Sequence, residues 1–590
     1  MNNTFNSGLR HKNIRRRTNT SLLAKKAEDV IPPIGDSIRV IPLGGVEEIG
    51  RNMTVIEYGN DIVVADVGIQ FTDSDTPGVD YILPNTKYLE ERKDKIRAIV
   101  ITHGHLDHIG GIPYLIERLG NPPIYTREMG GLLIKKRQSE FPQLPPLDIR
   151  IVDVDDKSIP LSANLKVRFF GVTHSIPDST GIIIETPYGD IITTGDVRIE
   201  NENGVPVEKE IEQYKMFKDR NVLLFTMDST GVEKPGFSPS ESSIIKNIDS
   251  IVANAPGRIV LATFASQVER IIEFFRMATR YGRKVVIEGR SMKNNVEIIK
   301  HLNLVDTSHI IPMEDLAKYP PNKIMMIVTG AQGEEFAALM RMSNDTHKFI
   351  RLERSDTVVL SSSIIPGNER AISKLKDNLY RHDSKIITYL DSDVHTSGHG
   401  KRGEIEWLHR QIPYKFFMPV HGHHHMLKMH AEVAANLGCP RENIVVPDNG
   451  NIIEIQDKGT QIVKLKEKAP SEDLVVEGLS IGPVSDVVIR DRKMLAEDGI
   501  FVVIALVNIR TGHLKKSPDI IARGFVYLRE SQELLSEARN IIKRAIESTT
   551  VGMNPINFDY AKNAVTEDVS RFLFQRTLKA PLVIPVILGV

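Results

Sequence analysis

After residue 37, short apolar runs alternate with polar turns, many of which contain glycine. The runs at residues 38–41, 53–57 and 62–65 are short and rich in β-branched side chains, which predicts strands. A helix is predicted at residues 112–118. Further strands are predicted at residues 98–101, 167–170, 181–186 and 190–194. This mixture predicts sheets that are covered by helices.

Between residues 236 and 400 the pattern changes to alternating strands and helices. Its apolar runs are continuous, as in parallel strands that are buried on both faces. These runs are at residues 259–262, 284–288, 324–329 and 357–361. The region is therefore predicted to be a separate α/β domain.

Residues 401–455 return to a helix, a strand at residues 416–420 and a histidine-rich turn. The charged stretch 456–474 is predicted to be a linker or a short exposed hairpin. The last domain, residues 475–590, is predicted to contain two strands and an amphipathic helix, at residues 486–490, 500–507 and 534–546. No internal repeat is present.

Residues 1–36 lack a sustained apolar period and are rich in Asn, Thr, Ser and basic side chains, including Arg15, Arg16, Arg17, Lys25 and Lys26. A flexible basic tail is predicted. Two interpretations of it stay open: attraction to a polyanion through phosphate neutralisation, or a solubilising extension without a specific partner.

Composition narrows the class of protein. A chain of 590 residues with a formal net charge of −1 is expected to form about two to four soluble domains. Its single cysteine, Cys439, excludes an intrachain disulfide and any cysteine-based metal cluster. No apolar run approaches the roughly 20 residues that span a bilayer, and the N-terminus lacks an apolar signal core. We expect a cytoplasmic protein without a membrane segment.

The densest chemistry lies directly after the strand at residues 98–101. Residues 102–108 read THGHLDH, with His103, His105, Asp107 and His108 in one short turn. Imidazole nitrogen suits zinc, and a carboxylate adds charge and an oxygen ligand, so this spacing can serve two adjacent cations. The segment therefore predicts a metal site.

A hydrolytic centre with two metals needs more ligands than one turn supplies. His174, Asp196 and His421 each follow a predicted strand, where loops can converge. Taken singly, each is more simply interpreted as a core or surface residue. Together with the turn at residues 102–108 they predict a two-metal centre.

At this point the chain resembles the metallo-β-lactamase superfamily, whose motifs match Asp66, the HxHxDH turn, His174, Asp196 and His421 in order. The resemblance implies an αββα sandwich. It also implies that one metal is bound by His103, His105 and His174, the other by Asp107, His108 and His421, with Asp196 between them. Asp66 would orient the histidine turn without binding metal.

Three positions extend the resemblance to the β-CASP nucleases. Asp228 matches their motif A, His399 motif B and His421 motif C. Within them, residues 38–590 look most like the ribonuclease J family. This implies a metallo-β-lactamase domain (residues 37–235 and 401–455) with an inserted β-CASP domain (residues 236–400) and a small C-terminal α/β domain.

The family resemblance implies a ribonuclease that degrades RNA 5′ to 3′ from a 5′-monophosphate end and also cuts internally, in rRNA processing and mRNA decay. Asp107 or Asp196 would orient the attacking water, and His399, next to Asp228, would protonate the leaving oxygen or bind phosphate. Hydroxyl and guanidinium groups suit a pocket for the terminal phosphate. The candidates are Ser266, Arg290, Ser291, Ser361, Ser362, Ser363, His395 and His399, with backbone N–H groups of residues 330–333 as a further candidate.

Several alternatives stay open. The cofactors are expected to be two divalent ions, zinc first and manganese second. The chain is expected to form a homodimer or homotetramer, with a paralogous subunit or an RNA-decay complex as further partners. His423, His424 and His425 depart from the family pattern and are not assigned as ligands. Competing functions are a non-catalytic RNA-binding partner subunit, a β-CASP nuclease acting on DNA, and a small-molecule hydrolase, which the inserted domain disfavours.

Overall fold

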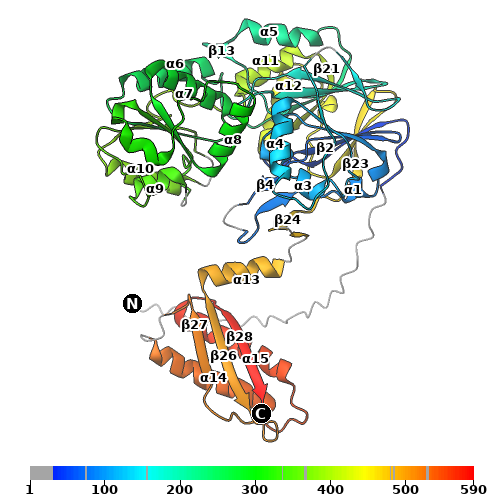
Figure 1. The fold of residues 1–590 in the computed structure, drawn as a ribbon. Coiled ribbons are helices and arrows are strands. Elements are labelled where there is room, and N and C mark those ends of the chain that lie inside the picture. The colour runs from blue at the N-terminus through cyan, green and yellow to red at the C-terminus, as the bar shows by residue number, and fades with distance from the viewer. Residues whose placement is uncertain are drawn as a thin grey trace, which may run out of the picture.

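The computed structural model describes residues 31–72, 76–154, 157–334, 337–364, 368–478, 480–482, 486–526 and 531–590. Most of the predicted basic tail at residues 1–36 lies outside these ranges. Figure 1 shows two large bodies side by side and a smaller C-terminal body below them.

Two sheets form the centre of the metallo-β-lactamase part. The larger sheet has the order β23-β22-β1-β2-β3-β6-β7-β8 and the other β21-β15-β12-β11-β10-β9. The strands of the larger sheet are β1 (Ile38–Gly44), β2 (Met53–Tyr58), β3 (Asp61–Ala65), β6 (Ile96–Val100), β7 (Ile124–Thr126), β8 (Ile149–Ile151), β22 (Asn451–Gln456) and β23 (Gln461–Lys468). Those of the other are β9 (Ile159–Pro160), β10 (Lys166–Gly171), β11 (Thr180–Thr186), β12 (Gly189–Thr193), β15 (Val222–Asp228) and β21 (Tyr414–Val420).

The two sheets pack face to face. Val40 and Val100 of the larger sheet share a buried apolar cluster with Phe169 and Phe416 of the other. Helices cover both outer faces: α1 (Lys87–Glu90), α2 (Leu106–Ile109), α3 (Ile112–Leu115) and α4 (Glu128–Gln138) on one side, and α5 (Glu208–Tyr214), α11 (Arg402–Gln411) and α12 (His424–Asn436) on the other. The four layers, in the order helices, sheet, sheet and helices, form the predicted αββα sandwich.

The inserted domain is a parallel sheet with helices on both faces, as the continuous apolar runs predict. Its strand order is β17-β18-β16-β19-β20. The strands are β16 (Ile259–Thr263), β17 (Lys284–Glu288), β18 (Ile324–Val328), β19 (Thr357–Ser361) and β20 (Lys385–Thr388). One face is covered by α6 (Glu241–Asn254), α7 (Val268–Tyr281) and α8 (Arg290–His301), and the other by α9 (Ala338–Ser343) and α10 (Glu369–Tyr380).

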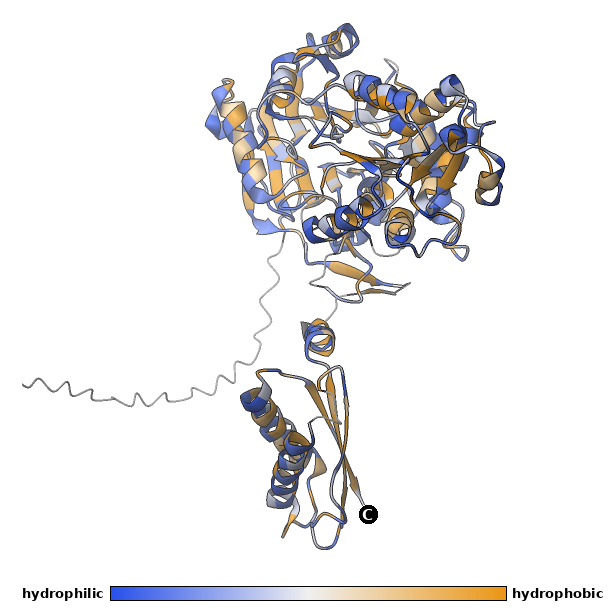
Figure 2. Cartoon of the chain, turned by 90° about the vertical axis from the view of Figure 1, so that its left-hand side faces the viewer, coloured by the Kyte–Doolittle hydropathy of each residue, from blue (hydrophilic) through white to orange (hydrophobic). Residues whose placement is uncertain are grey.

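The C-terminal body has the sheet order β27-β26-β28. Its elements are α13 (Asp486–Glu497), β26 (Ile500–Val507), β27 (Asp519–Arg523), α14 (Gln532–Thr550), α15 (Phe558–Thr577) and β28 (Leu582–Gly589). Helices α14 and α15 pack on one face of the sheet. Figure 2 shows that the strands of this sheet are hydrophobic along most of their length.

Short elements complete the chain. A small sheet has the order β25-β24-β5-β4, and a hairpin is formed by β13 and β14. Their bounds are β4 (Gln70–Phe71), β5 (Tyr81–Leu83), β24 (Leu474–Glu477), β25 (Ser480–Gly482), β13 (Asn201–Glu202) and β14 (Val205–Pro206). Short 3₁₀ helices occur at η1 (Lys93–Lys95), η2 (Lys215–Phe217), η3 (Met313–Lys318), η4 (Pro321–Lys323) and η5 (Arg441–Asn443).

Two local predictions are corrected. Residues 486–490 were predicted as a strand but begin helix α13, so the run of β-branched residues there misled the prediction. The stretch 456–474 contains β23, which pairs antiparallel with β22 at the edge of the larger sheet. The hairpin alternative therefore holds for residues 461–468, and a free linker does not.

The sandwich is built from segments on both sides of the insertion. β1 pairs antiparallel with β22, with Ile38 opposite Ile455, and β15 pairs in parallel with β21, with Asp228 opposite Val420. The loops that follow β6, β10, β12, β15 and β21 consequently meet at one edge. Among the described residues, no helix is both long and apolar enough to cross a membrane.

Candidate metal centre

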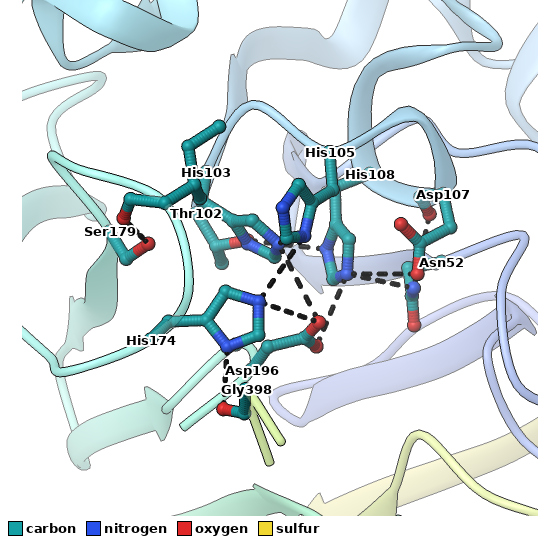
Figure 3. Close-up of polar contacts among 12 residues, drawn as sticks. Asn52, Thr102, His103, His105, Asp107, His108, His174, Ser179, Asp196 and Gly398 are labelled. Carbon is teal, nitrogen blue, oxygen red and sulfur yellow. Dashed lines mark hydrogen bonds and ion pairs between the residues drawn. The ribbon is translucent and has the colours of Figure 1, made fainter. Parts of the chain in front are cut away.

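The histidine turn is anchored to the strand that precedes it in the sheet. Asp66, which follows β3, accepts hydrogen bonds from the backbone N–H and the hydroxyl of Thr102, at 2.8 and 2.9 Å. It also lies 2.7 Å from Nδ1 of His108. Figure 3 shows His108 together with His103, His105 and His174 around Asp196. Because an ionised carboxylate only accepts, His108 carries its proton on Nδ1 and directs Nε2 into the site. Asp66 therefore contacts the turn at both of its ends, at Thr102 and at His108.

Three imidazoles converge on one side of the site. Nδ1 of His105 lies 3.0 Å from Nε2 of His103 and 3.2 Å from Nε2 of His174. His174 contacts the carbonyl of Gly398 through Nδ1, at 2.7 Å, and must donate there. In a neutral ring its Nε2 then presents a lone pair to the other two histidines. Lone pairs that face one another repel, and a cation bound between them would remove this repulsion.

A second group lies beside the first. Nε2 of His108 is 3.5 Å, and Nε2 of His421 is 3.4 Å, from the same oxygen of Asp107. The hydroxyl of Thr230 lies 2.9 Å from Nδ1 of His421. His421 has a φ of 52°, a left-handed conformation that is rare outside glycine and is found at functional sites.

Asp196 lies between the two groups and is almost fully buried, with 2% of its surface exposed. Its Oδ2 is 3.6 Å from Nε2 of both His103 and His174. Its Oδ1 is 3.2 Å from Nε2 of His108 and 3.6 Å from Nδ1 of His421. One carboxylate oxygen thus faces each group, which is the geometry of a bridging ligand.

The pKa shifts of the ionisable side chains agree with this division into two groups. Burial disfavours the charged form of His103, His105 and His174 and lowers the pKa of each, to about 3 for His174. Burial acts in the same direction on His108 and His421, but the carboxylates, Asp196 first, outweigh it and raise the pKa of both, to about 10 for His421. Burial also opposes the ionised form of Asp196, yet His421 and His108 outweigh it and hold its pKa well below the usual range.

The donor set fits two divalent cations. Ligand atoms of His103, His105, His174 and Asp196 all lie within 4.8 Å of one another, and so do those of Asp107, His108, Asp196 and His421. Nitrogens bound to a tetrahedral zinc at ~2.0–2.1 Å are about 3.3 Å apart, close to the spacing of the three converging rings. Oδ1 of Asp196 is buried without a hydrogen-bond donor among the described residues, as a ligand oxygen would be.

His399 stands next to these ligands and is held by Asp228. Its Nδ1 lies 2.6 Å from Oδ2 of Asp228, and its Nε2 is 3.9 Å from Asp196. Burial opposes the charged form of His399, but Asp228 and Asp196 outweigh it and raise its pKa. The pair therefore presents Nε2 of the His399 imidazole to the centre from the end of the inserted domain.

The candidate phosphate-binding residues lie at the switch point of the inserted sheet. Strand β16 lies between β18 and β19 in the sheet, and the chain crosses β16 as it passes from β18 to β19, so the loops that follow these three strands are neighbours at the end of the sheet where ligands of open α/β folds bind. Ser266 follows β16, and Ser362 and Ser363 follow β19. Gln332, after β18, donates to the hydroxyl of Ser362 at 3.2 Å and the carbonyl of Ser363 at 2.7 Å.

Other candidates are placed differently. Arg290 and Ser291 begin α8, after β17, while His395 follows β20 on the opposite side of the switch point. Ser361 is fully buried and donates its hydroxyl proton to the carbonyl of Val394 at 2.7 Å. Its hydroxyl is therefore engaged inside the domain, and direct contact between Ser361 and a ligand is not supported.

Comparisons with known proteins agree with this architecture. Residues 47–263 match the metallo-β-lactamase superfamily, residues 256–379 the β-CASP domain of ribonuclease J, and residues 487–590 the ribonuclease J C-terminal domain. Ribonuclease J2 of Bacillus subtilis is 34% identical over 94% of this chain and 99% of its own length. Ribonuclease J 1 of Streptococcus pyogenes is also 34% identical, over 94% and 98%. The chain belongs to the ribonuclease J family.

A third relative of the ribonuclease J family supports the same assignment. Ribonuclease J of Corynebacterium glutamicum is 34% identical over 94% of this chain and 76% of its own length. A crystal structure of a protein of unknown function from Enterococcus faecalis superposes with a TM-score of 0.51 and 17% identity, and it covers 71% of this chain and 100% of its own. That likeness concerns the fold alone.

The three histidines that depart from the ribonuclease J pattern lie outside the two ligand groups. His423, His424 and His425 are exposed. His424 is 3.5 Å from Asp448, and His425 is 3.4 Å from Glu233. Their nearest charged partners are therefore surface carboxylates, in keeping with leaving them unassigned.

Sequence reasoning missed the residues that support the site in this ribonuclease J relative. Thr230 next to His421, Arg270 next to His395 and Glu404 beneath the loop of Asp196 carry no local motif. Gly398, just before His399, approaches the site closely, since a Cβ there would lie 2.6 Å from Cε1 of His174. These roles depend on contacts between distant segments, so only the folded chain reveals them.

Proposed function

We propose that this member of the ribonuclease J family hydrolyses RNA by a two-metal mechanism, 5′ to 3′ from a monophosphorylated end and also internally. As a family member it is a metal-dependent ribonuclease. The observation that carries the proposal is the position of Asp196, with one oxygen toward each group of imidazoles and the His399–Asp228 pair alongside.

The proposed ligands of one ion are His103, His105 and His174, and of the other Asp107, His108 and His421, with Asp196 shared. When bound, two divalent ions supply Lewis acidity to the phosphoryl oxygens and lower the pKa of the water nucleophile. We propose zinc first and manganese second, because imidazole nitrogen suits zinc while a carboxylate-rich site also accepts manganese.

The residues of the chain provide the proton transfers. The carboxylates of Asp107 and Asp196 orient the attacking water, and one of them accepts its proton as the new P–O bond forms. His399 gives its Nε2 proton to the 3′-oxygen as the P–O3′ bond breaks. Asp228 keeps the ring in place by accepting from Nδ1 at 2.6 Å.

A pocket at the switch point of the inserted sheet is proposed to bind the 5′-terminal phosphate. Ser266, Ser362, Ser363, Arg290, Ser291 and His395 lie on loops or helix starts after its strands. Hydroxyl, guanidinium and N–H donors match phosphate oxygens. A terminal phosphate held there would set the direction of degradation, from the 5′ end toward the metal centre.

The C-terminal domain is proposed to assemble the chain into a homodimer or homotetramer. One face of its sheet is apolar and uncovered by the described residues, with Ile521, Ile584, Val586 and Leu588 exposed. Assembly with a paralogous subunit or an RNA-decay complex and activity in the cytoplasm belong to the same proposal.

One digestion experiment tests the activity. RNAs with a 5′-monophosphate, a 5′-triphosphate or a 5′-hydroxyl and a matched DNA are incubated with chelated protein, to which zinc or manganese is returned. We expect metal-dependent release of nucleotides, fastest from the monophosphate. Asp196→Asn should abolish cleavage and retain RNA binding. Full activity of this variant contradicts the proposal, RNA binding without cleavage by the wild type supports a partner subunit, and preferred cleavage of DNA supports a deoxyribonuclease.

A further inference from the structure

Arg270 is a buried arginine that no part of the proposed reaction uses. It lies in the first turn of α7, and 1% of its surface is exposed. Its Nε and one terminal nitrogen bind both carboxylate oxygens of Glu241 on α6, at 2.8 and 2.7 Å. This two-point ion pair fixes the plane of the guanidinium.

The remaining terminal nitrogen of Arg270 points at the loop that carries the motif-B histidines. It lies 2.8 Å from Nδ1 of His395 and 3.3 Å from the hydroxyl oxygen of Ser361. Ser361 in turn donates to the carbonyl of Val394. The loop before His399 is thus held by Arg270 at His395 and, at 3.5 Å, at the carbonyl of Thr396, and by Ser361 at the carbonyl of Val394.

The chemistry of the contact fixes the proton of His395. A guanidinium has five N–H donors and no acceptor. Nδ1 of His395 must therefore accept, and a neutral ring then carries its proton on Nε2. Among the described residues, no side chain forms a hydrogen bond with Nε2; the ring lies against the backbone of Ser361 and is only partly buried. The nitrogen that donates is the one left available to a ligand.

The same arginine is linked to the metal centre. Arg198, two residues after Asp196, donates to Glu200 at 2.7 Å and lies 4.0 Å from the carboxylate of Glu241. Glu200 also accepts from the backbone N–H of Glu241 at 3.2 Å. A buried chain of charges thus runs from the loop of Asp196 through Glu241 and Arg270 to His395.

We propose that Arg270 is a positioning residue that fixes the proton of His395 on Nε2, so that this ring acts only as a hydrogen-bond donor toward the 5′-terminal phosphate of RNA. The inference rests on the proposed function and deepens it. A ring that donates without being able to accept favours a phosphate oxygen over a 5′-hydroxyl, because the hydroxyl would lose its own donor bond.

The decisive variant removes the ion pair as a unit, R270M with E241M, because R270M alone would leave Glu241 buried and uncompensated. R270K keeps one charged donor near Nδ1 and serves as the conservative variant. R283M is the matched control, since Arg283 is 4% exposed in the same domain but donates only to backbone carbonyls, among them Gly257 and Ile324. Circular dichroism and thermal unfolding establish that each variant is folded.

The first readout is the ratio of kcat/KM on 5′-monophosphate RNA to that on 5′-hydroxyl RNA. In R270M/E241M this ratio should fall by about tenfold or more, mainly through KM. R270K should recover part of it, and R283M should lose thermal stability while its ratio stays within about twofold of the wild type.

The second readout is nitrogen-15 NMR of histidine-labelled protein, with the His395 signals identified by their absence in H395Q. The wild type should show a protonated Nε2 and an unprotonated Nδ1, and the double variant should lose this bias. A protonated Nδ1 in the wild type overturns the inference.

The failures can be told apart. A wild type that cleaves RNA without any preference for its 5′ end contradicts the proposed pocket and the inference with it. A wild-type preference that survives in folded R270M/E241M contradicts the role of Arg270 alone. The NMR readout needs no RNA, so it tests the assignment of the proton even if the proposed activity fails.

Discussion

The contact between Asp228 and His399 determines which nitrogen of the imidazole faces the phosphodiester. Because the carboxylate accepts from Nδ1, the proton that can reach a leaving oxygen is on Nε2. Thr230 and His421 stand on the other side of Asp228. One oxygen of Asp228 therefore contacts His399, and the other contacts Thr230 and His421.

We therefore expect Asp228→Asn to lower kcat by about 10²–10⁴ with little loss of bound metal. The amide keeps the size of the side chain but no longer stabilises protonated His399. Initial rates on labelled RNA, with metal content measured by mass spectrometry, check this. Asp219→Asn, at an exposed position on the same domain, is the control. Loss of one ion in D228N would instead make Asp228 a metal ligand.

A second residue far from the metals makes stability depend on pH. Nδ1 of His347 accepts from the backbone N–H groups of Phe349 and Ile350, at 3.3 and 3.2 Å. Only a ring unprotonated at Nδ1 can accept both, and burial, which outweighs the attraction of Glu288, lowers the pKa of His347. The unfolded chain then binds a proton more readily than the folded one.

The sign follows from that difference. The contribution of His347 to stability is fully present above its unfolded pKa of about 6.5 and is lost as the pH falls below that value. His347→Asn offers an acceptor oxygen that does not titrate. We expect the variant to lose less thermal stability than the wild type between pH 7.5 and pH 5.5, and an identical loss in both proteins would refute the assignment.

Candidate site residues could be named from the sequence where the chemistry is concentrated. The HxHxDH turn, Asp196 and His421, which the structure brings together, could be named because each follows an apolar run. Arg270 and Glu404 could not, because a buried charge is recognised only by the partners that packing brings to it. Ser361 was grouped with its neighbours, although its hydroxyl is directed into the domain.

Helix α11 begins with a carboxylate that ties three segments together. Glu404 is fully buried and accepts from the backbone N–H groups of Ile199, Ser238 and Lys401, at 3.1, 2.8 and 2.7 Å, and from the hydroxyl of Ser238 at 2.8 Å. Both connections between the sandwich and the inserted domain are thus held at the N-terminus of one helix.

Removal of this side chain should destabilise the protein. Glu404→Ala leaves several buried donors without an acceptor, and we expect a loss of about 2–4 kcal/mol in the free energy of unfolding. Glu406→Ala, two residues later on the same helix, removes a weaker contact with Arg410 at 3.4 Å and should cost less than about 0.5 kcal/mol. Urea unfolding of both variants measures the difference, and equal losses would argue against the role of Glu404.

Helices and strands could be predicted where the spacing of apolar residues fits only one of the two. The strands at residues 62–65 and 357–361 coincide with β3 and β19 because continuous apolar runs admit few alternatives in a buried sheet. The run at residues 486–490 failed because Val487, Val488 and Ile489 favour strands locally, while the polar residues up to Glu497 complete a helix. For residues 456–474 the charged composition left a linker and a short exposed hairpin open; β23 pairs with β22, and its side chains are exposed or only partly buried.

At the scale of the whole molecule, the C-terminal sheet presents an apolar face. Ile584 pairs with Val502, Val586 with Ile504 and Leu588 with Leu506, so the side chains of neighbouring strands lie side by side. Helices α14 and α15 cover the opposite face. A continuous exposed apolar surface of this kind marks an interaction site.

We expect Val586→Glu to reduce the oligomeric state of the protein. A charge in the centre of the face would have to be buried in an assembly, whereas Val586 is already 37% exposed in the single chain. Light scattering coupled to size-exclusion chromatography measures the mass. Gln575→Glu, which adds the same charge at an exposed position on α15, should leave it unchanged. An oligomer unaffected by V586E would place the interface elsewhere.

Because the inserted domain divides the sandwich in the sequence, the residues of the candidate metal centre are synthesised at different times. During synthesis, His103, His105, His174 and Asp196 emerge from the ribosome before the inserted domain, whereas His421 and the strand that pairs with Ile38 emerge after it. At the usual rate of translation the interval is on the order of tens of seconds. Under the proposed two-metal mechanism, the group of His103, His105 and His174 would be complete long before the group that needs His421, and cleavage of RNA would begin only after His421 has been added.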